Sequence, residues 1–168
     1  MTTRVLIVDD SAFTRKVLRD VLEAAPGIEV VGVARDGLDA LSKIEELDPD
    51  VLTLDLVMPH LDGLDTLRAL ASRSRPRVIV VCMADADSEQ ALAALDAGAV
   101  DVVHKPTALA TDRLYGLSQE LVFKVQAAAE ARNNPARAPS LPPLRVASPR
   151  GIRRDLVVIG ASTGGPQP

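Results

Sequence analysis

The sequence predicts a doubly wound α/β fold, in which five parallel strands form one sheet with helices on both faces. Two observations support this prediction. Five short apolar runs rich in β-branched residues recur along the chain, and each is followed by a segment whose apolar residues have helical spacing. Such alternation favours a parallel sheet, because right-handed crossovers place the connecting helices on its faces.

The five apolar runs are nearly continuous, without regular alternation between apolar and polar residues. Continuous runs are typical of strands that are buried on both faces, as in parallel sheets. We therefore expect strands at Val5–Val8, Val30–Val33, Val51–Leu54, Val78–Cys82 and Val100–Val103.

Apolar residues between the runs recur every three or four positions, as on one face of a helix. In chain order, the residues expected to face the core are Phe13, Val17, Val21 and Ala25; Leu38, Leu41, Ile44 and Leu47; Leu64, Leu67 and Ala71; Leu92 and Leu95; and Leu114, Leu117, Leu121 and Val125. Gly98 is well placed to end the fourth helix, since glycine readily adopts the left-handed conformation found at helix C-termini. Among the common orders of doubly wound sheets, 2-1-3-4-5 suits five strands.

The composition limits the classes of partner and compartment. The formal net charge of −4 argues against direct contact with nucleic acid, because phosphate binding usually needs a basic surface. The single cysteine, Cys82, excludes an intrachain disulfide and fits a reducing compartment. The first apolar run is too short for a signal peptide, and no stretch approaches the ~20 residues of a membrane span. We therefore expect a cytoplasmic protein without membrane insertion.

A change in composition divides the chain into an α/β domain over residues 1–128, a linker over 129–154 and a final segment over 155–168. Prolines and arginines are frequent between residues 133 and 154, where no acidic residue occurs. This composition favours an extended spacer, with a basic docking segment as the alternative. Asp155–Ile159 again resembles a buried strand.

Charged residues follow the first, third and fifth predicted strands. Asp9 and Asp10 follow the first, Asp55 the third and Lys105 the fifth. In the order 2-1-3-4-5 the first and third strands are neighbours, and ligands of open α/β sheets bind at the carboxyl ends of the strands near this point. We therefore expect three carboxylates to lie together with an ammonium group nearby.

Three clustered carboxylates repel one another, and a divalent cation would offset that repulsion. A set of oxygen ligands with room for water and phosphate suggests Mg²⁺. One carboxylate could then attack phosphorus while the cation and a lysine neutralise charge on the phosphoryl oxygens. A single aspartate after a strand is more often a helix N-cap, so the joint placement of all four residues carries the hypothesis.

Three segments resemble the signature segments of response-regulator receiver domains: LIVDDS, LTLDLVMPHLDG and HKP. Their order and spacing match that family, and the resemblance covers about residues 3–125. It implies the flavodoxin-like receiver fold for residues 1–128.

The resemblance also implies roles for individual residues. Asp55 would be the phosphoacceptor, and Asp10, Asp55 and the backbone carbonyl of Val57 would ligate Mg²⁺. Asp9 would assist through a water molecule, and Lys105 would contact the phosphoryl group. The Lys105–Pro106 peptide is expected to be cis, as the family suggests and as X–Pro bonds permit.

The sequence departs from the family pattern at two positions that normally transmit phosphorylation. Met83 stands where receivers carry a serine or threonine, and methionine cannot donate a hydrogen bond. Val102 stands at the position of the aromatic switch residue. Phosphorylation is still expected, but the usual coupling of hydroxyl and aromatic residue is in doubt.

The segment GASTGGP near the end of the sequence has the character of a nucleophile on a tight turn between strand and helix, with Ser162 exposed. On its own the segment is also compatible with an ordinary glycine-rich turn. A receiver, a linker rich in arginine and proline, and VVIGASTGG together resemble the chemotaxis protein-glutamate methylesterase family. In that family the receiver restrains an esterase domain that uses a serine at the Ser162 position with a histidine and an aspartate further along.

The sequence is thus interpreted as the receiver of two-component chemotaxis signalling, phosphorylated on Asp55 by a histidine kinase and regulating a methylesterase that demethylates chemoreceptors. The expected partners are the kinase and a chemoreceptor or effector domain. One alternative is an interaction module that does not depend on phosphate. The other, for a longer parent protein, is a serine hydrolase acting on receptor glutamyl methyl esters. No esterase turnover is expected from residues 1–168, because a serine without its histidine and aspartate retains little activity.

Three other residues have simpler interpretations. Cys82 lies in an apolar run and is expected to be a buried, inert thiol. His60 is interpreted as a solvated histidine of the loop after the third strand, with control of access to Asp55 as the alternative. His104 is expected to point to the opposite side of its strand from Lys105 and is assigned no role.

Overall fold

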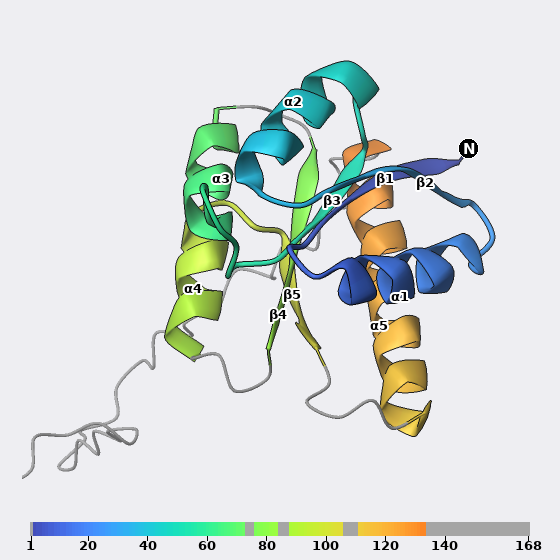
Figure 1. Cartoon of the computed structure of the whole chain (residues 1–168). Coiled ribbons are helices and arrows are strands. Elements are labelled where there is room, and N and C mark those ends of the chain that lie inside the picture. Colours follow the sequence, from blue (N-terminus) through green and yellow to red (C-terminus); the bar gives the residue numbers. More distant parts are fainter. Residues whose placement is uncertain (1, 73–75, 84–87, 106–110, 134–168) are drawn as a thin grey trace, which may run out of the picture. The chain divides into compact units, whose positions relative to one another are not determined.

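The structure is a computed structural model of the chain, and it describes residues 2–72, 76–83, 88–105 and 111–133. Strands and helices alternate along these residues (Figure 1). The strands are β1 (Thr3–Val8), β2 (Ile28–Ala34), β3 (Val51–Leu54), β4 (Arg77–Met83) and β5 (Asp101–Lys105). The helices are α1 (Ala12–Glu23), α2 (Gly37–Leu47), α3 (Gly63–Leu70), α4 (Ser88–Asp96) and α5 (Thr111–Asn133).

The strands form one parallel sheet in the order β2-β1-β3-β4-β5, which confirms the predicted fold class and strand order. β3 lies at the centre and is flanked by β1 and β4. The prediction for the fifth strand was wrong at its limits, because β5 begins after the exposed Val100 and includes Lys105. The register pairs Met83 with Lys105, so β4 and β5 end at the same edge.

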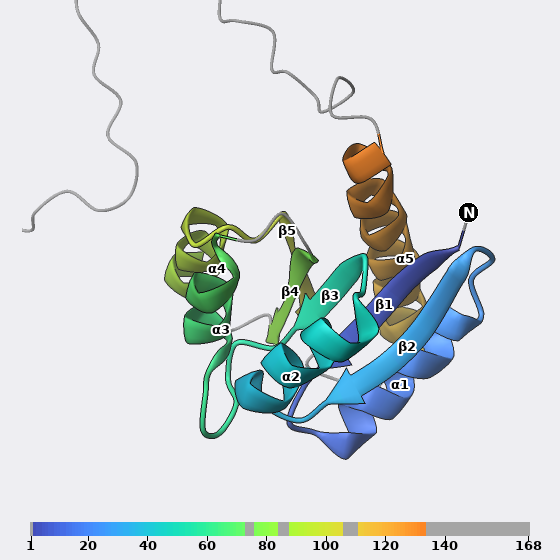
Figure 2. The same cartoon turned by 90° about the horizontal axis from the view of Figure 1, so that it is seen from above.

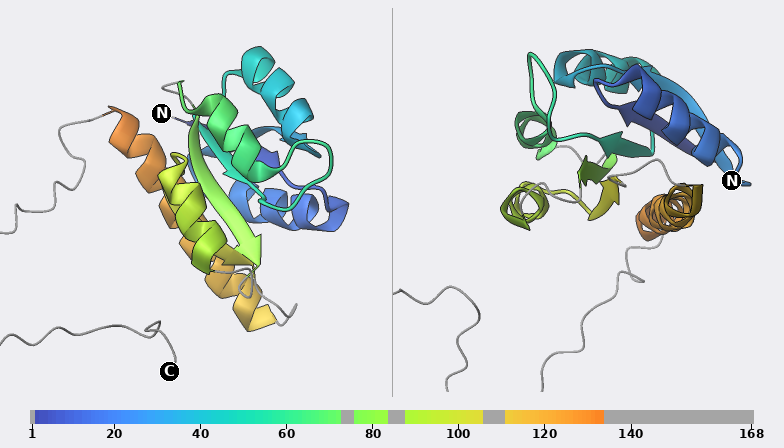
Figure 3. Two further views of the ribbon diagram at one scale, coloured as in Figure 1. Left: turned by 90° about the vertical axis from the view of Figure 1, so that its left-hand side faces the viewer. Right: turned by 60° about the horizontal axis from the view of Figure 1, so that its bottom comes forward.

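Helices cover both faces of the sheet. α1 and α5 lie on one face, and α2, α3 and α4 lie on the other, as the two orthogonal views show (Figures 1 and 2). The additional views show the same two layers of helices with the strands between them (Figure 3). Connections of this kind bring the carboxyl ends of all five strands to one edge of the sheet.

Successive residues of the strands pack against opposite layers. Val5 and Ile7 of β1 belong to the core beneath α1 and α5, whereas Leu6 and Val8 belong to the core beneath α2, α3 and α4. All four residues of β3 are buried. Burial on both faces explains why the apolar runs are continuous in the sequence.

The helical spacing of apolar residues did not identify every core-facing residue. Phe13, Leu38, Leu92 and Leu95 were expected to face the core and are exposed. The smaller Ala40 in α2 and Ala94 in α4 are fully buried in the core instead. Small side chains let a helix approach the sheet closely, so the largest apolar residues of a helix do not by themselves define its inner face.

The helix ends follow the expected capping chemistry. Ser11, Asp36 and Asp62 precede α1, α2 and α3, and each side chain accepts a hydrogen bond from the backbone N–H three residues further on. Gly98 has a φ of 107° and follows α4, as expected. Its N–H donates to the carbonyl of Leu95 and that of Ala99 to the carbonyl of Ala94, which is the Schellman arrangement.

The predicted domain limits stay predictions. The expected boundary at residue 128 falls inside α5, which continues to Asn133. The peptide bond to Pro106, most of the linker and the final segment with Ser162 lie outside the described residues. Among the helices that the structure describes, none combines the length and the apolar character needed to cross a membrane.

Candidate functional site: an acidic cluster at the sheet edge

Three aspartates meet at the carboxyl edge of β1 and β3. Asp9 and Asp10 follow β1 directly, and Asp55 follows β3. One carboxylate oxygen from each lies within 4.8 Å of the others. Asp9 and Asp55 are buried, at 1% and 7% exposure, whereas Asp10 is exposed. The structure therefore brings together the three acidic residues that the sequence predicted at this edge.

Lys105, the last residue of β5, bridges two of these aspartates. Its Nζ atom lies 2.7 Å from Oδ2 of Asp9 and 2.7 Å from Oδ2 of Asp55. The lysine side chain is largely buried. Charge-assisted hydrogen bonds of this length are strong, and here one ammonium group serves two buried carboxylates.

The electrostatics of the cluster follow from its burial. Burial raises the pKa of Asp9 above its ordinary value, although hydrogen bonding to Lys105 opposes the increase. Burial alone would lower the pKa of Lys105, but its hydrogen bonds to Asp55 and Asp9 outweigh that effect and raise it. The ammonium group therefore remains charged, while Asp9 would be stabilised by further positive charge.

The β3–α3 loop, residues 55–62, presents Asp55. The two ends of the loop lie close together, since the N–H of Gly63 donates to the carbonyl of Leu56 over 3.1 Å. A Cβ atom on Gly63 would overlap the carbonyl oxygen of Asp55, so only glycine fits there. Within the loop, the N–H of Val57 lies 3.4 Å from Oδ1 of Asp55. This close approach fixes the backbone from which the Asp55 carboxylate projects.

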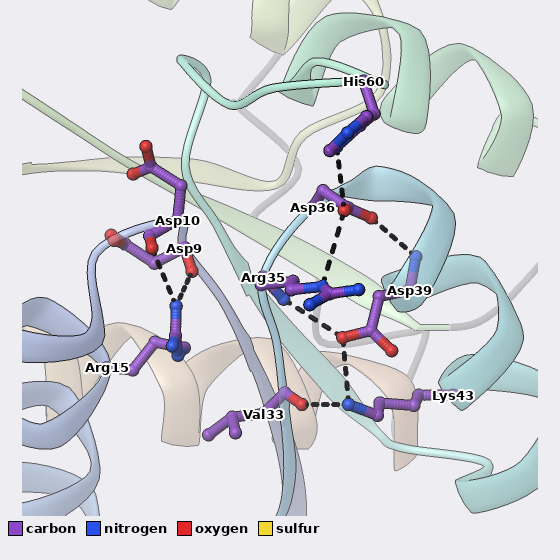
Figure 4. A network of polar contacts seen from close by, with 9 residues as sticks. All are labelled: Asp9, Asp10, Arg15, Val33, Arg35, Asp36, Asp39, Lys43 and His60. Atoms are coloured by element: carbon purple, nitrogen blue, oxygen red, sulfur yellow. Dashed lines mark hydrogen bonds and ion pairs between the residues drawn. The ribbon is translucent and has the colours of Figure 1, made fainter.

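Arg15 holds the backbone of the two neighbouring aspartates. One of its guanidinium nitrogens, Nη1, donates to the carbonyl oxygens of Asp9 at 2.7 Å and Asp10 at 3.0 Å (Figure 4). The N–H of Ser11 also donates to Oδ1 of Asp9. Sequence analysis missed Arg15, although side chains in the first turn of a helix lean toward its N-terminus and can reach the preceding loop.

A second polar cluster joins the β3–α3 loop to the start of α2. Nδ1 of His60 lies 3.2 Å from Oδ2 of Asp36 (Figure 4). The imidazole is 65% exposed and the Asp36 carboxylate 8%. His60 is therefore largely solvated, as expected, but no sequence pattern indicated its acidic partner.

The two atypical positions lie where the sequence placed them along the strands. Met83 ends β4, and Val102 is a partly buried residue of β5. Cys82 is buried and free, and burial raises the pKa of its thiol. Its Sγ atom lies 3.7 Å from Nδ1 of the exposed His104, so His104 and Lys105 point to different sides of β5.

The acidic cluster fits a hard divalent cation. It offers carboxylate oxygens from three residues and no nitrogen or sulfur ligand among the described groups around it. Such donors suit Mg²⁺ better than zinc or copper. The exposed Asp10 opens the cluster to solvent, so incoming groups could share the coordination sphere with the protein.

Comparisons of the sequence with known proteins identify its family. Residues 5–114 match the family model described as the response regulator receiver domain. The "Protein-glutamate methylesterase/protein-glutamine glutaminase 5" of Myxococcus xanthus is 64% identical over 98% of this chain and 48% of its own length. The chain thus spans about half the length of the curated relatives that it matches.

Solved structures show the same fold. The response regulator domain of Thermotoga maritima CheB has a TM-score of 0.69 and 39% sequence identity, covering 77% of this chain and 98% of that domain. A chain from the CheX-CheY-BeF3-Mg+2 complex of Borrelia burgdorferi has a TM-score of 0.59 and 30% identity, covering 71% of this chain and 88% of its own.

Proposed function

The chain belongs to the response regulator receiver family, and on that premise we propose that it accepts a phosphoryl group on Asp55 with Mg²⁺ bound beside it. The donor would be a phosphohistidine of a histidine kinase in a two-component chemotaxis system. Asp10, Asp55 and the carbonyl of Val57 would ligate the cation, and Asp9 would assist through a water molecule.

One observation carries this proposal. Lys105 Nζ contacts Oδ2 of both Asp9 and Asp55 at 2.7 Å, while Asp10 completes a cluster of acidic oxygens within 4.8 Å. A nucleophilic carboxylate, ligands for a cation and a fixed ammonium are the groups that phosphoryl transfer to an aspartate requires. In the Borrelia burgdorferi structure, a similar domain was crystallised with BeF3 and Mg²⁺.

The proposed reaction is a single displacement at phosphorus. A carboxylate oxygen of Asp55 attacks the phosphorus atom as the bond from phosphorus to the donor imidazole breaks, and the imidazole leaves with that electron pair. The product is an acyl phosphate on Asp55. Lys105 donates a hydrogen bond to a phosphoryl oxygen and offsets part of its negative charge. Bound Mg²⁺ supplies positive charge that offsets the charge of the phosphoryl oxygens.

The output is proposed to be control of a protein-glutamate methylesterase. Relatives with that name match nearly the whole chain, including the residues after α5. Residues 1–128 would form the receiver, 129–154 a linker and 155–168 the first segment of the esterase domain, with Ser162 as its nucleophile. The substrates would be methylated glutamyl side chains of chemoreceptors, and the protein would act in the cytoplasm.

The alternatives have less support. A phosphate-independent interaction module does not require a lysine that bridges two buried aspartates at the carboxyl edge of the sheet. A hydrolase would depend on residues beyond the described part of the chain. The receiver is therefore the function that the described residues support best.

The proposal is tested by phosphorylation of the full chain with a small-molecule phosphoryl donor and Mg²⁺, followed by intact-mass analysis. We expect one added phosphoryl group on the wild type and none on Asp55→Asn. Asparagine is nearly isosteric with aspartate, and an unchanged far-UV spectrum would show that the variant is folded. Phosphorylation of Asp55→Asn to the same extent would refute the assignment, as would a wild type that remains unmodified.

A further inference from the structure

We propose that His60 is a positioning residue for the phosphoacceptor site, because its contact with Asp36 fastens the β3–α3 loop to the start of α2. The inference rests on the proposed function, since the loop carries Asp55 and the carbonyl of Val57. It concerns the affinity of the site for Mg²⁺.

The β3–α3 loop is tied to α2 at two points. In the first, the N–H of Gly37 donates to the carbonyl of Leu61 over 3.1 Å. The approach is so close that a Cβ atom on Gly37 would overlap this carbonyl oxygen and the hydroxyl of Thr66. In the second, Nδ1 of His60 lies 3.2 Å from Oδ2 of Asp36. The first contact is between backbones and does not titrate, whereas the second joins two ionisable side chains.

The carboxylate of Asp36 is held by contacts to both of its oxygens. Its Oδ1 atom accepts a hydrogen bond from the N–H of Asp39 at the start of α2, which leaves Oδ2 directed toward His60. That hydrogen bond is the largest cause that lowers the pKa of Asp36, and the charge on His60 adds to it. The lowered pKa keeps the carboxylate charged across the neutral range, although burial opposes the lowering, and the burial of the side chain limits its orientations.

The other charged groups around this contact are either more distant from Asp36 or bonded to other partners. Arg35 Nε is more distant from Oδ2 of Asp36, at 3.9 Å, and the Arg35 backbone N–H donates to Asp39. Asp39 is also paired with Lys43, whose Nζ donates to the carbonyl of Val33 (Figure 4). On the loop itself, Asp62 caps α3. The Asp36 carboxylate is thus the partner that faces His60 at hydrogen-bond distance.

The backbone of His60 adopts a conformation that needs support. Its φ is 65°, in the left-handed region that residues other than glycine seldom adopt. Two of the loop residues between Asp55 and His60, Leu56 and Met58, are buried in the core, while Val57 is exposed. Because Val57 lies between buried neighbours and only three positions before His60, a fixed His60 restricts the conformations open to the backbone of Val57.

The exposure of the imidazole keeps the effect of the contact modest. We expect wild-type protein to bind Mg²⁺ about threefold more tightly than His60→Gly.

The experiment measures the dissociation constant for Mg²⁺ alone by amide NMR titration of the full chain, and it compares the wild type with His60→Gly. Glycine also suits the positive φ, so the variant is expected to fold at least as well as the wild type. His60→Asn, which also tolerates this conformation, keeps a hydrogen-bond donor and should bind Mg²⁺ with intermediate affinity.

Two further variants separate positioning from general loosening. Asp36→Ser retains a side chain that can cap α2 but removes the carboxylate, so it should match His60→Gly. Lys43→Met removes a charge from the same polar cluster without touching the loop, and it should bind Mg²⁺ as the wild type does.

A wild type that binds no Mg²⁺ would overturn the proposed function together with this inference. Wild-type binding that is equal to that of His60→Gly would overturn the inference alone. A loss of equal size in Lys43→Met would also overturn it.

Discussion

Lys105 and Asp55 are 50 positions apart in the chain, yet Lys105 Nζ donates a hydrogen bond to Oδ2 of Asp55 over 2.7 Å. The same nitrogen bonds Asp9, 96 positions away. Three strands thereby converge on one ammonium group at the edge of the sheet. Because two carboxylates share one ammonium group, a change at any of the three residues alters the net charge of the site.

Removing the ammonium group should destabilise the protein. Lys105→Met leaves Asp9 and Asp55 buried without their shared cation, and breaking a buried ion pair typically costs about 3 kcal/mol. We expect a loss of that order in the free energy of unfolding, measured with urea at neutral pH without Mg²⁺. Adding Mg²⁺ should stabilise the variant more than the wild type, and equal stabilisation of the two would contradict the shared-cation interpretation.

Asp9→Asn should have opposite effects on stability and on cation binding. Burial raises the pKa of Asp9, so the folded protein binds a proton there more tightly than the unfolded chain does. The contribution of Asp9 to stability therefore falls as pH rises from about 4 through the raised pKa. Above that window we expect Asp9→Asn to be more stable than the wild type without Mg²⁺ and to bind Mg²⁺ more weakly. Urea midpoints from about pH 4 to pH 8 measure the first effect; a wild-type advantage that grows with pH would disprove it.

Gly63 should tolerate no side chain. Gly63→Ala would place Cβ against the carbonyl oxygen of Asp55 and the Cα atom of Leu56, and backbone atoms cannot move aside as side chains can. We expect a loss of about 2 kcal/mol in the free energy of unfolding and weaker Mg²⁺ binding, since Asp55 must shift. Gly27→Asn is the control, because Gly27 has a positive φ but open space around its Cα, and it should lose less than about 1 kcal/mol.

Lys124 should contribute more to stability than an exposed lysine. Its Nζ atom bonds Asp101 and Glu120, each at 2.9 Å, and the carbonyl of Val102 at 2.6 Å, which joins α5 to β5. Burial alone would lower its pKa, but the hydrogen bonds to Glu120 and Asp101 outweigh this and raise it. Its contribution is therefore complete at neutral pH and is lost as pH rises through the raised pKa.

The Lys124 prediction is measured by urea unfolding at neutral pH. Lys124→Met should lose about 1.5 kcal/mol, whereas Lys16→Met, which removes an exposed pair with Asp20, should lose less than about 0.5 kcal/mol. Equal losses in the two variants would show that the connection between α5 and β5 adds no stability of its own.

Met83→Thr tests the atypical switch position. Met83 ends β4 and pairs in register with Lys105, so position 83 lies at the edge of the sheet that carries the acidic cluster. We expect amide shifts induced by beryllofluoride and Mg²⁺ to extend further along β4 and β5 in the variant than in the wild type. If the two proteins show shifts of the same extent, Met83 does not limit the response.

The order of the sheet and the acidic cluster could be predicted from the sequence because both depend on simple rules. Continuous apolar runs identify buried parallel strands, and the residues that follow them must meet at one edge. Asp9, Asp55 and Lys105 follow or end such strands, and the structure brings them within hydrogen-bond distance. Strand limits were less accurate, as Val100 shows, because an apolar residue next to a turn has the same character as one inside a strand.

The contacts that sequence analysis missed depend on loop conformation. His60 contacts Asp36 from a loop position whose φ is 65°, and no periodicity in the sequence encodes that angle. Leu38 in α2 and Leu92 in α4 were misjudged for another reason. Ala40 and Ala94 are the fully buried residues of these helices, and side-chain size alone favours the leucines.

The central position of β3 provides a reference within the molecule. Its residues are fully buried and lie between two paired strands, so in hydrogen-exchange experiments its amides should become accessible only when the whole domain opens. The amides of Val57 and Leu61, a few residues further on, belong to the loop that carries Asp55. The exchange rates of the Val57 and Leu61 amides, divided by those of the β3 amides, would measure local opening of the loop relative to unfolding of the whole domain in the same sample.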